Sequence, residues 1–418
     1  MNEFKTGGAR FDVAVVGAGP AGVTAALALA HIGARVALIG PAPGRAAKGQ
    51  AETRTAALLA SSVDLLKRLG VWDALAPQAA PLKVIRIVDA SRSLFRAPEV
   101  VFEAREVGLE AFGYNLANTV LLEVLYARAQ EVLPAVFPLS VEAIALGDRD
   151  AHLSLPGGHR LTARLVAGAD GRHSACRQAA SIEVSEWRYD QGAIATSFRH
   201  TRPHDGVSTE LHRELGSVTT VPTPESLVSS LIWVDAQPEI AALMACDETA
   251  FAARLQARLG DALGQVSDVG PRAPFPVAGL TAKKLAQKRT ALIGEAAHIL
   301  PPIGAQGLNL GLRDAAALAD CVNGALRRGH DPGGQTVLSA YIRTRQLDVL
   351  SRTVGVDLLN RSLLTSLLPV QAARGLLLHG LHAFAPLRRM IMRAGLAPPV
   401  ELPSLMRPPP AGSPHLRA

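Results

Sequence analysis

A glycine-rich stretch near the start of the chain has the spacing that a phosphate-binding turn requires. It consists of Gly17, Ala18, Gly19, Pro20, Ala21 and Gly22. The apolar run 13–16 precedes it, and an alanine-rich segment that we expect to be helical to about His31 follows it. In such a turn the second glycine lets the backbone approach a pyrophosphate, which lies at the helix N-terminus. The pattern alone also fits a turn that binds nothing, but its position between strand and helix favours a dinucleotide site.

Gly40 directly follows the second expected strand, 35–39. An Asp or Glu is usual at this position, where it binds the adenosine ribose. A small residue with an arginine close behind, here Arg45, is also how such a site accommodates the 2'-phosphate of NADP. These residues therefore leave open which dinucleotide the site holds.

Two later stretches carry further polar groups at strand ends. Residues 165–174 place Asp170 and Gly171 after a short apolar strand, where the carboxylate could meet ribose or amide donors. Residues 291–312 combine a strand end, an acid, two prolines and a glycine-rich entry into another helix, whose N-terminus is a second anion site or dipole source. One fold that contains both elements implies a long cofactor held at its two ends.

The elements that position these groups follow from the hydrophobic pattern. We expect helices over 56–69, from an N-cap at Asn118, and over about 307–326. The runs 193–198, 217–221 and 227–234 are rich in β-forming residues and separated by turn residues, so they predict a sheet outside the nucleotide-binding layer.

Composition limits the class of protein and its compartment. The chain has 418 residues, 48% of them hydrophobic, and three widely spaced cysteines with no metal or redox spacing. No metal site is expected. The start of the chain lacks an apolar signal core and no apolar run is long enough to span a bilayer, so we expect a cytoplasmic protein.

The net charge of +7 is concentrated at the C-terminal end, where residues 361–418 contain seven arginines and one acid. The segment 361–396 is also rich in apolar residues. It fits a basic amphipathic segment on a membrane surface, and equally a helix pair packed on the body with solvated arginines. Nucleic acid is disfavoured because no recognition module accompanies the charge.

With these motifs in this order, the chain resembles the FAD-dependent aromatic hydroxylases, a family of flavoprotein monooxygenases. The resemblance covers about residues 11–355 and rests on GAGPAG at 17–22, GADG at 168–171 and GEAAHILPPIGAQGLN at 294–309. Within the family, the stretches ETRTAALLASSVDLLKRLGVWDAL, EAFGYNLAN and PPIGAQGLNLGLRDAAALAD look most similar to the hydroxylases of ubiquinone biosynthesis.

The resemblance implies an FAD site made of the glycine turn and a set of later residues. These are Arg54, Asn118, Asp170, Gly171, Gly294, Glu295, Pro302, Gly304, Gly307, Leu308 and Asn309. Glu295 stands where the family usually has Asp, and Asn118 where a basic or glutamine side chain is common. Because FAD has no 2'-phosphate, Arg45 becomes a solvated loop residue, and Gly40 predicts a loosely held adenosine end unless backbone groups, Gln50 or Glu52 replace the missing contact.

The resemblance also implies the fold. We expect an α/β protein with a Rossmann-like FAD-binding domain, an inserted β-sheet substrate domain and a C-terminal helical region. The expected segments are 1–80, 116–181 and 283–355 for the FAD-binding domain, 81–115 for an excursion to the substrate domain, 182–282 for that domain, 356–398 for the helical basic region and 399–418 for a disordered tail.

The implied reaction is the hydroxylation of a phenolic ring, with O2 and NADPH or NADH as co-substrates, through a flavin hydroperoxide. The implied substrate is a lipid-like polyprenylated phenol of ubiquinone biosynthesis, which suits a peripherally membrane-associated enzyme and a biosynthetic complex. A hydroxylase of small soluble aromatics and a non-catalytic flavoprotein-like subunit are the alternatives. Because the chemistry is flavin-borne, no side chain is a certain catalyst; His298 and Pro302 are weak candidates. Tyr114 and Asn115 are candidates for substrate contact, with a core role equally open.

Overall fold

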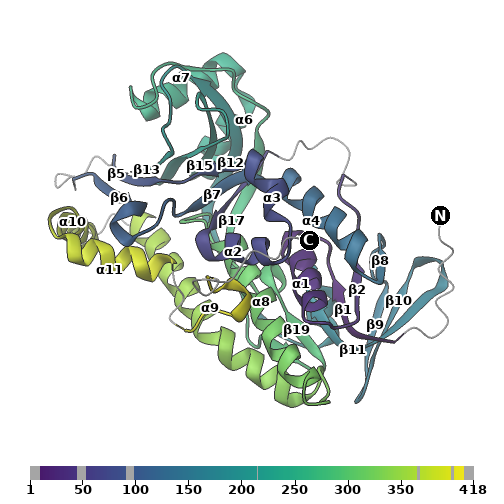
Figure 1. The fold of residues 1–418 in the computed structure, drawn as a ribbon. Helices are drawn as coiled ribbons and strands as arrows, with labels where there is room; N and C mark the ends of the chain where they lie inside the picture. Colours follow the sequence, from purple (N-terminus) through teal and green to yellow (C-terminus); the bar gives the residue numbers. More distant parts are fainter. Residues whose placement is uncertain are drawn as a thin grey trace.

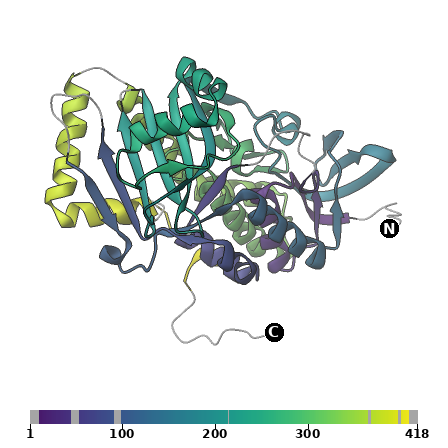
Figure 2. The same cartoon turned by 90° about the horizontal axis from the view of Figure 1, so that it is seen from above.

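The computed structural model describes residues 10–44, 53–90, 98–213, 215–364, 368–396 and 400–408. Two large sheets, a small three-stranded sheet and the helices that cover them make up this part of the chain (Figure 1). The helices α10 (Leu368–Ala383) and α11 (Ala385–Leu396) lie at the opposite end of the molecule from the strands β9 (Ala143–Leu146) and β10 (Ala151–Leu155), as the view from above also shows (Figure 2).

The first sheet has eight strands, and its centre is parallel. β1 pairs in parallel with β2 and β11, β2 with β8, and β11 with β19, while β9, β10 and β18 add antiparallel edges. Besides β9 and β10, the strands are β1 (Arg10–Val16), β2 (Val36–Ile39), β8 (Ala135–Phe137), β11 (His159–Gly168), β18 (Ala286–Gln287) and β19 (Thr290–Leu292).

The apolar runs of β1 and β2 are continuous because both faces of these strands are buried. Along β1, Val13 and Val15 join the core cluster that includes α1 (Pro20–His31), α4 (Asn118–Val132) and α8 (Gln306–Leu326), whereas Ala14 and Val16 join a second cluster on the other face. The expected strand–turn–helix–strand unit is therefore present.

The second sheet has nine strands and includes β5 and β6, which come from the segment 81–115 that we expected to leave the first layer. The helices α6 (Gln237–Ala245) and α7 (Glu248–Leu259) pack on one of its faces over Trp233. Its strands are β5 (Val84–Asp89), β6 (Val100–Glu103), β12 (Val184–His200), β13 (Val207–Arg213), β14 (Gly216–Pro222), β15 (Val228–Ala236), β16 (Val266–Ser267), β17 (Ala273–Ala282) and β20 (His298–Ile299).

The predicted helix over 56–69 is wrong in its first turn. Residues Thr55–Leu59 form strand β3, and helix α2 begins at Ala60 and ends at Arg68. β3 pairs with β7 (Gly113–Ala117), which also pairs with β4 (Ala80–Pro81). The sequence TAALL fits the hydrophobic period of a helix as well as that of a strand, and the long-range pairing with β7 decides for the strand.

The predicted N-cap at Asn118 is one residue late. Ala117 is the N-cap of α4, and Asn118 is the first helical residue. The short helices α3 (Trp72–Leu75) and α5 (Ala175–Ala179) complete the region around the first sheet.

The C-terminal part is helical, as expected, but its limits differ. Helix α9 (Gln335–Leu364) runs through the predicted boundary at 355. The prediction of a disordered tail is wrong for residues 400–408, because Leu405 and Met406 are buried in the main core beside α2 and α8, and the Ser404 amide donates to Asp320. Residues 409–418 lie outside the described part. Among the described residues, no helix has both the length and the apolar character needed to cross a bilayer.

Candidate functional site

The turn between β1 and α1 contains glycines of two kinds. Gly17 has φ +112°, and a Cβ there would lie 2.1 Å from the carbonyl oxygen of Ala169; a Cβ on Gly22 would lie 1.9 Å from the oxygen of Gly17. Both glycines are therefore required for packing. A Cβ on Gly19, in contrast, would meet nothing within 4 Å. Gly19 is the N-cap of α1 and has no side-chain cap, so it leaves the first N–H groups of the helix open to an anion.

Asp170 is positioned by the helix that follows it. Its carboxylate accepts hydrogen bonds from Ser174 Oγ (2.6 Å) and from the amide of Cys176 (3.0 Å) at the start of α5. The expectation of amide donors is thus met within the protein. A Cβ on the neighbouring Gly171, φ +75°, would meet nothing within 4 Å.

Arg177 joins this turn to the segment 294–309, and sequence reasoning missed it. The guanidinium is buried and donates to the carbonyl oxygens of Ala296 (2.9 Å) and Arg172 (2.7 Å). A buried arginine satisfied by carbonyl oxygens leaves no mark in a single sequence.

Gly294 and Glu295 have opposite surroundings. Gly294, φ +59°, packs against Ala21 of α1 and Gly311 of α8, and its amide donates to Asp314 (3.0 Å). Glu295 is exposed, and no described residue makes a hydrogen bond or ion pair with its carboxylate. Its charge is therefore available to a ligand.

His298 is held by an internal carboxylate. Its ring is buried, and Nε2 donates to Asp314 (2.7 Å), while Nδ1 has no partner among the described residues. Asp314 also accepts from Arg345 Nε (2.7 Å). These contacts support a role in ordering the segment; the weak hypothesis of catalysis by His298 has no contact in its favour.

The start of α8 is open on its outer side and locked on its inner side. Gly304 and Gly307 are exposed, a Cβ on Gly307 would meet nothing within 4 Å, and Pro302 and Leu308 are half-buried. Ala305, the N-cap, has φ +53°.

Asn309 provides the lock. Its Oδ1 accepts from the Leu59 amide (2.8 Å) and from Ser62 Oγ (2.7 Å), and its Nδ2 donates to the carbonyl oxygens of Ala57 (2.8 Å) and Ala305 (2.7 Å). With all four hydrogen-bonding positions used, this side chain fixes the N-terminus of α8 to the β3–α2 junction.

Arg54 and Asn118 lie beside each other at the start of α4. The Asn118 amide donates to the carbonyl oxygen of Arg54 (3.1 Å), and Asn118 Oδ1 is buried without a partner among the described residues. An unpartnered buried acceptor is costly, so it points to a ligand group at this position.

The two candidates for substrate contact have structural roles in this structure. The Tyr114 ring packs edge-on against Trp72 at 5.1 Å. Asn115 Nδ2 donates to the carbonyl oxygen of Pro222 on β14 (2.8 Å), which ties the three-stranded sheet to the nine-stranded one, but Asn115 Oδ1 is buried and unpartnered within the described part.

One face of the nine-stranded sheet is turned toward these elements. Thr55 of β3 forms a hydrogen bond with Ser230 of β15 (3.0 Å), so the side chains of β15 that alternate with Ser230 share its face. The strand register places Ile232, Val234, Ala193 and Phe275 on that face, together with Thr219, Ser217, Glu210 and His212. His212 Nε2 donates to Glu210 Oε1 (2.8 Å). The face therefore has an apolar half and a polar half.

The family follows from comparison with known proteins. The family described as "FAD binding domain" matches residues 10–349. Over nearly its full length the chain is also 34% identical to the ubiquinone hydroxylase UbiL of Rhodospirillum rubrum, covering 95% of this chain and 92% of that protein. The chain belongs to the FAD-dependent aromatic hydroxylases.

One further relative agrees with that assignment, and one solved structure agrees with the fold. This hydroxylase is 33% identical to the 3-demethoxyubiquinol 3-hydroxylase of Escherichia coli over 92% of this chain and 98% of that one. The crystal structure of p-nitrophenol 4-monooxygenase PnpA from Pseudomonas putida shares the fold, with a TM-score of 0.74, 20% identity and coverage of 94% and 100% of the two chains. The predictions of the family, of the α/β fold and of an FAD-dependent monooxygenase are confirmed.

The position at the end of β2, where an acid is usual, has no room for a side chain in this hydroxylase. A Cβ on Gly40 would lie 2.4 Å from the amide nitrogen and 2.8 Å from the Cβ of Ala18. Any side chain at position 40 would therefore push on the glycine turn at Ala18. Arg45, Gln50 and Glu52, the residues considered for this region, lie outside the described residues.

We expect that Gly40→Glu weakens FAD binding, although it introduces the acid that related sites use. The new side chain must displace the backbone at Ala18, which we expect to cost about 1–3 kcal/mol of unfolding free energy. Titration of the apoprotein with FAD and urea unfolding measure both effects. Pro41→Glu, which adds the same charge at an exposed position, is the control. Tighter FAD binding by Gly40→Glu would contradict the steric explanation.

Proposed function

We propose that this protein hydroxylates the aromatic ring of a polyprenylated phenol in ubiquinone biosynthesis, with FAD as its resident cofactor. The observation that carries the proposal is the full-length similarity to two hydroxylases named for ubiquinone or demethoxyubiquinol, at 34% and 33% identity. NADPH or NADH as reductant and O2 as oxidant belong to the same proposal.

The residues present fit FAD. Gly19, Gly171 and Gly307 border open space, Asn118 Oδ1 is buried without a partner in the described part, and the Glu295 carboxylate has no protein partner there. We assign the pyrophosphate to the start of α1, with Gly17–Gly22 as its turn. The remaining assignments are Arg54 and Asn118 beside the adenosine end, Asp170 and Gly171 at the β11 turn, Gly294 and Glu295 at the ribityl chain, and Pro302, Gly304, Gly307, Leu308 and Asn309 along the ring system.

Bound FAD supplies the reaction with O2 and the transfer of one oxygen atom to the substrate ring. The chain supplies orientation and charge. The N-terminus of α8 favours negative charge on the flavin edge next to it, because its first N–H groups have no partner within the helix. Asn309 keeps that N-terminus in place, and Asp314 holds the turn at Gly294 through its amide. Asn309 thus acts on the flavin through the backbone of α8.

The substrate ring is proposed to lie against the sheet face that carries Ser230. Ile232, Val234 and Phe275 provide an apolar surface for a substituted ring, and the Glu210–His212 pair provides polar groups for its hydroxyl or methoxy substituents. Asn115 Oδ1, unpartnered within the described chain, lies on the strand next to this face.

A polyprenyl substrate also bears on where the enzyme works. Such a chain is retained in the bilayer, so we propose peripheral association with a membrane on its cytoplasmic side and contact with other proteins of the pathway. The excess of arginine in residues 361–396 is consistent with this placement.

Mass spectrometry of quinone intermediates in a strain that lacks the gene tests the function. We expect a polyprenylated phenol that is one hydroxylation short of its product to accumulate, and the wild-type gene to remove it. Glu295→Ala is expected to restore little activity and to bind FAD about ten- to a hundredfold more weakly, because a charge-assisted hydrogen bond is lost. Glu142→Ala, at an exposed position, is the control.

Two outcomes separate the alternatives. A small soluble aromatic compound that accumulates instead of a prenylated phenol would indicate a hydroxylase of soluble substrates. A non-catalytic subunit would be indicated if the strain with Glu295→Ala makes normal amounts of quinone and only the deletion strain lacks it.

A further inference from the structure

Exposed apolar side chains are gathered on the C-terminal helices. Nine of the eleven large hydrophobic residues that are exposed in the described chain lie in α9, α10, α11 or the residue that joins α10 to α11. They are Leu347, Leu350, Val354, Leu358, Leu359, Leu376, Leu377, Phe384 and Met390. Exposed apolar residues concentrated in this way mark an interaction surface. We call their outer side the basic apolar face.

On helix α9, four of these residues form a continuous stripe. Leu347, Leu350, Val354 and Leu358 are three or four residues apart, so they lie on one side of the helix. The opposite side is already buried through Tyr341, Arg345 and Val349. A helix that already packs on the protein through one side and is apolar on its outer side needs a partner on that outer side as well.

The charge of this face selects the partner. Between residues 343 and 396 the only acids are Asp348 and Asp357. Asp348 is buried among arginines, and Asp357 accepts hydrogen bonds from Tyr189 and Arg361. Arg389 and Arg393 are exposed on α11. A second copy of the chain would place the same cations opposite one another, whereas an anionic lipid surface complements them.

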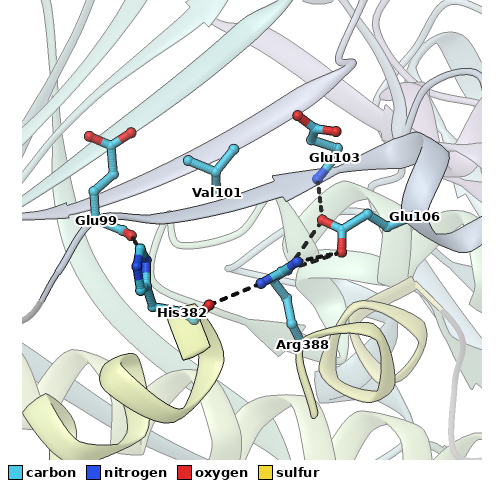
Figure 3. Close-up of a pocket in the computed structure, with 6 residues that line it drawn as sticks. All are labelled: Glu99, Val101, Glu103, Glu106, His382 and Arg388. Atoms are coloured by element: carbon cyan, nitrogen blue, oxygen red, sulfur yellow. Dashed lines mark hydrogen bonds and ion pairs between the residues drawn. The ribbon is translucent and has the colours of Figure 1, made fainter. Parts of the chain in front are cut away.

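The helix pair α10–α11 has a fixed orientation. Arg388 forms a two-pronged ion pair with Glu106 (Nη2–Oε2 2.8 Å, Nε–Oε2 3.0 Å), and His382 Nδ1 donates to the carbonyl oxygen of Glu99 (2.9 Å; Figure 3). These residues line a pocket between β6 and the two helices. Arg388 lowers the pKa of Glu106, so this ion pair persists at neutral pH.

A second attachment joins the end of α11 to α9. The Arg352 guanidinium donates to the carbonyl oxygens of Gly395 (3.1 Å) and Ala394 (3.0 Å). Of the arginines in the segment 361–396, Arg388 is thus not solvated, because its charge is used inside the protein by Glu106. On α11, the exposed cations available to lipid are those of Arg389 and Arg393.

We propose that the basic apolar face docks on an anionic lipid bilayer, with Leu376, Leu377, Phe384 and Met390 inserted at the acyl boundary and Arg389 and Arg393 among the headgroups. The proposal rests on the proposed function only in that a prenylated substrate gives such docking its purpose. Residues of this kind in this arrangement bind the interface plane without crossing it.

Flotation of the FAD-loaded protein with vesicles tests the proposal. Vesicles of phosphatidylcholine with about one third phosphatidylglycerol are compared with pure phosphatidylcholine, without substrate. We expect binding that is stronger to the anionic vesicles and falls as salt rises. Leu376→Ser/Leu377→Ser/Phe384→Ser and, separately, Arg389→Gln/Arg393→Gln are expected to lower the partition coefficient about tenfold or more.

Matched controls come from the same protein. Val132→Ser/Leu215→Ser removes the two other large hydrophobic residues that are exposed in the described part of the chain, and Arg327→Gln/Arg328→Gln removes two exposed cations elsewhere. Both should float like the wild type, and unchanged FAD content and thermal unfolding show that each variant is folded.

Equal flotation of wild type and face variants would overturn the proposal, and so would a wild-type dimer that the face variants dissociate and that does not float. These outcomes are independent of the proposed function, which is read from the accumulated intermediate. Loss of flotation with an intact quinone profile would separate docking from catalysis.

Discussion

Asp314→Asn is expected to lower the free energy of unfolding of the apoprotein by about 3–5 kcal/mol. Asp314 is fully buried and accepts hydrogen bonds from Arg345 Nε, His298 Nε2 and the Gly294 amide. Without its charge, Arg345 depends on Asp348, which Arg313 already shares (2.6 Å). A buried cation without sufficient compensation is among the most costly changes a core can undergo.

The pH dependence of stability gives a second expectation for the same variant. Burial alone would raise the pKa of Asp314, but His298 and Arg345 outweigh burial and hold this pKa below the usual 3.8. A carboxyl with a lowered folded-state pKa stabilises the protein above its unfolded pKa, and this contribution is lost as pH falls through the folded value. The difference in stability between wild type and Asp314→Asn should therefore be full above about pH 5 and shrink below about pH 4.

Urea unfolding between pH 3 and 8 measures both effects. Asp150→Asn removes the carboxylate of an exposed ion pair with Arg10 and should change stability by less than about 1 kcal/mol. A loss for Asp314→Asn as small as that of the control would mean that the buried network stabilises little.

This network was not predictable from the sequence, and the reason is physical. Charged residues on a helix normally face solvent, so Arg313 and Asp314 read as surface positions in α8. They are buried because Arg345, on the next helix, compensates Asp314. Only the packing of α9 on α8 brings these charges together.

Local patterns succeeded where one element determines its own environment. The apolar runs of β1 and β2 and the glycine turn predicted a strand–turn–helix unit that the structure contains. They failed where a contact with a distant segment determines the structure. Pairing with β7 makes Thr55–Leu59 a strand. Leu405 and Met406 pack in the core, although their proline-rich segment predicted a disordered tail. The motifs named candidate site residues, but not the partners that fix these segments, such as Arg177 and Ser62.

Gly17→Ala and Gly19→Ala are expected to fail for different reasons, although the two residues are only two positions apart. At Gly17 a methyl group would lie 2.1 Å from the Ala169 oxygen in a backbone conformation that alanine rarely adopts, so we expect a loss of about 3 kcal/mol or more of unfolding free energy without any cofactor. At Gly19 φ is −75° and the space is open, so the apoprotein should lose no more than about 1 kcal/mol.

For FAD binding, in contrast to the stability of the apoprotein, Gly19→Ala is the informative variant. If the FAD pyrophosphate approaches the start of α1 at Gly19, the methyl group of Gly19→Ala occupies that approach and should weaken FAD binding about tenfold or more while the apoprotein stays folded. Urea unfolding of both apoproteins and fluorescence titration with FAD separate the two effects. Gly17→Ala is expected to lower the unfolding free energy, whereas Gly19→Ala is expected to lower mainly the affinity for FAD. Full FAD affinity in a stable Gly19→Ala protein would move the pyrophosphate away from α1, whereas a stable Gly17→Ala protein would show that the Ala169 turn yields to a side chain. A Cβ on Gly19 would meet no protein atom within 4 Å, so the two measurements together test whether FAD occupies the open space beside this residue.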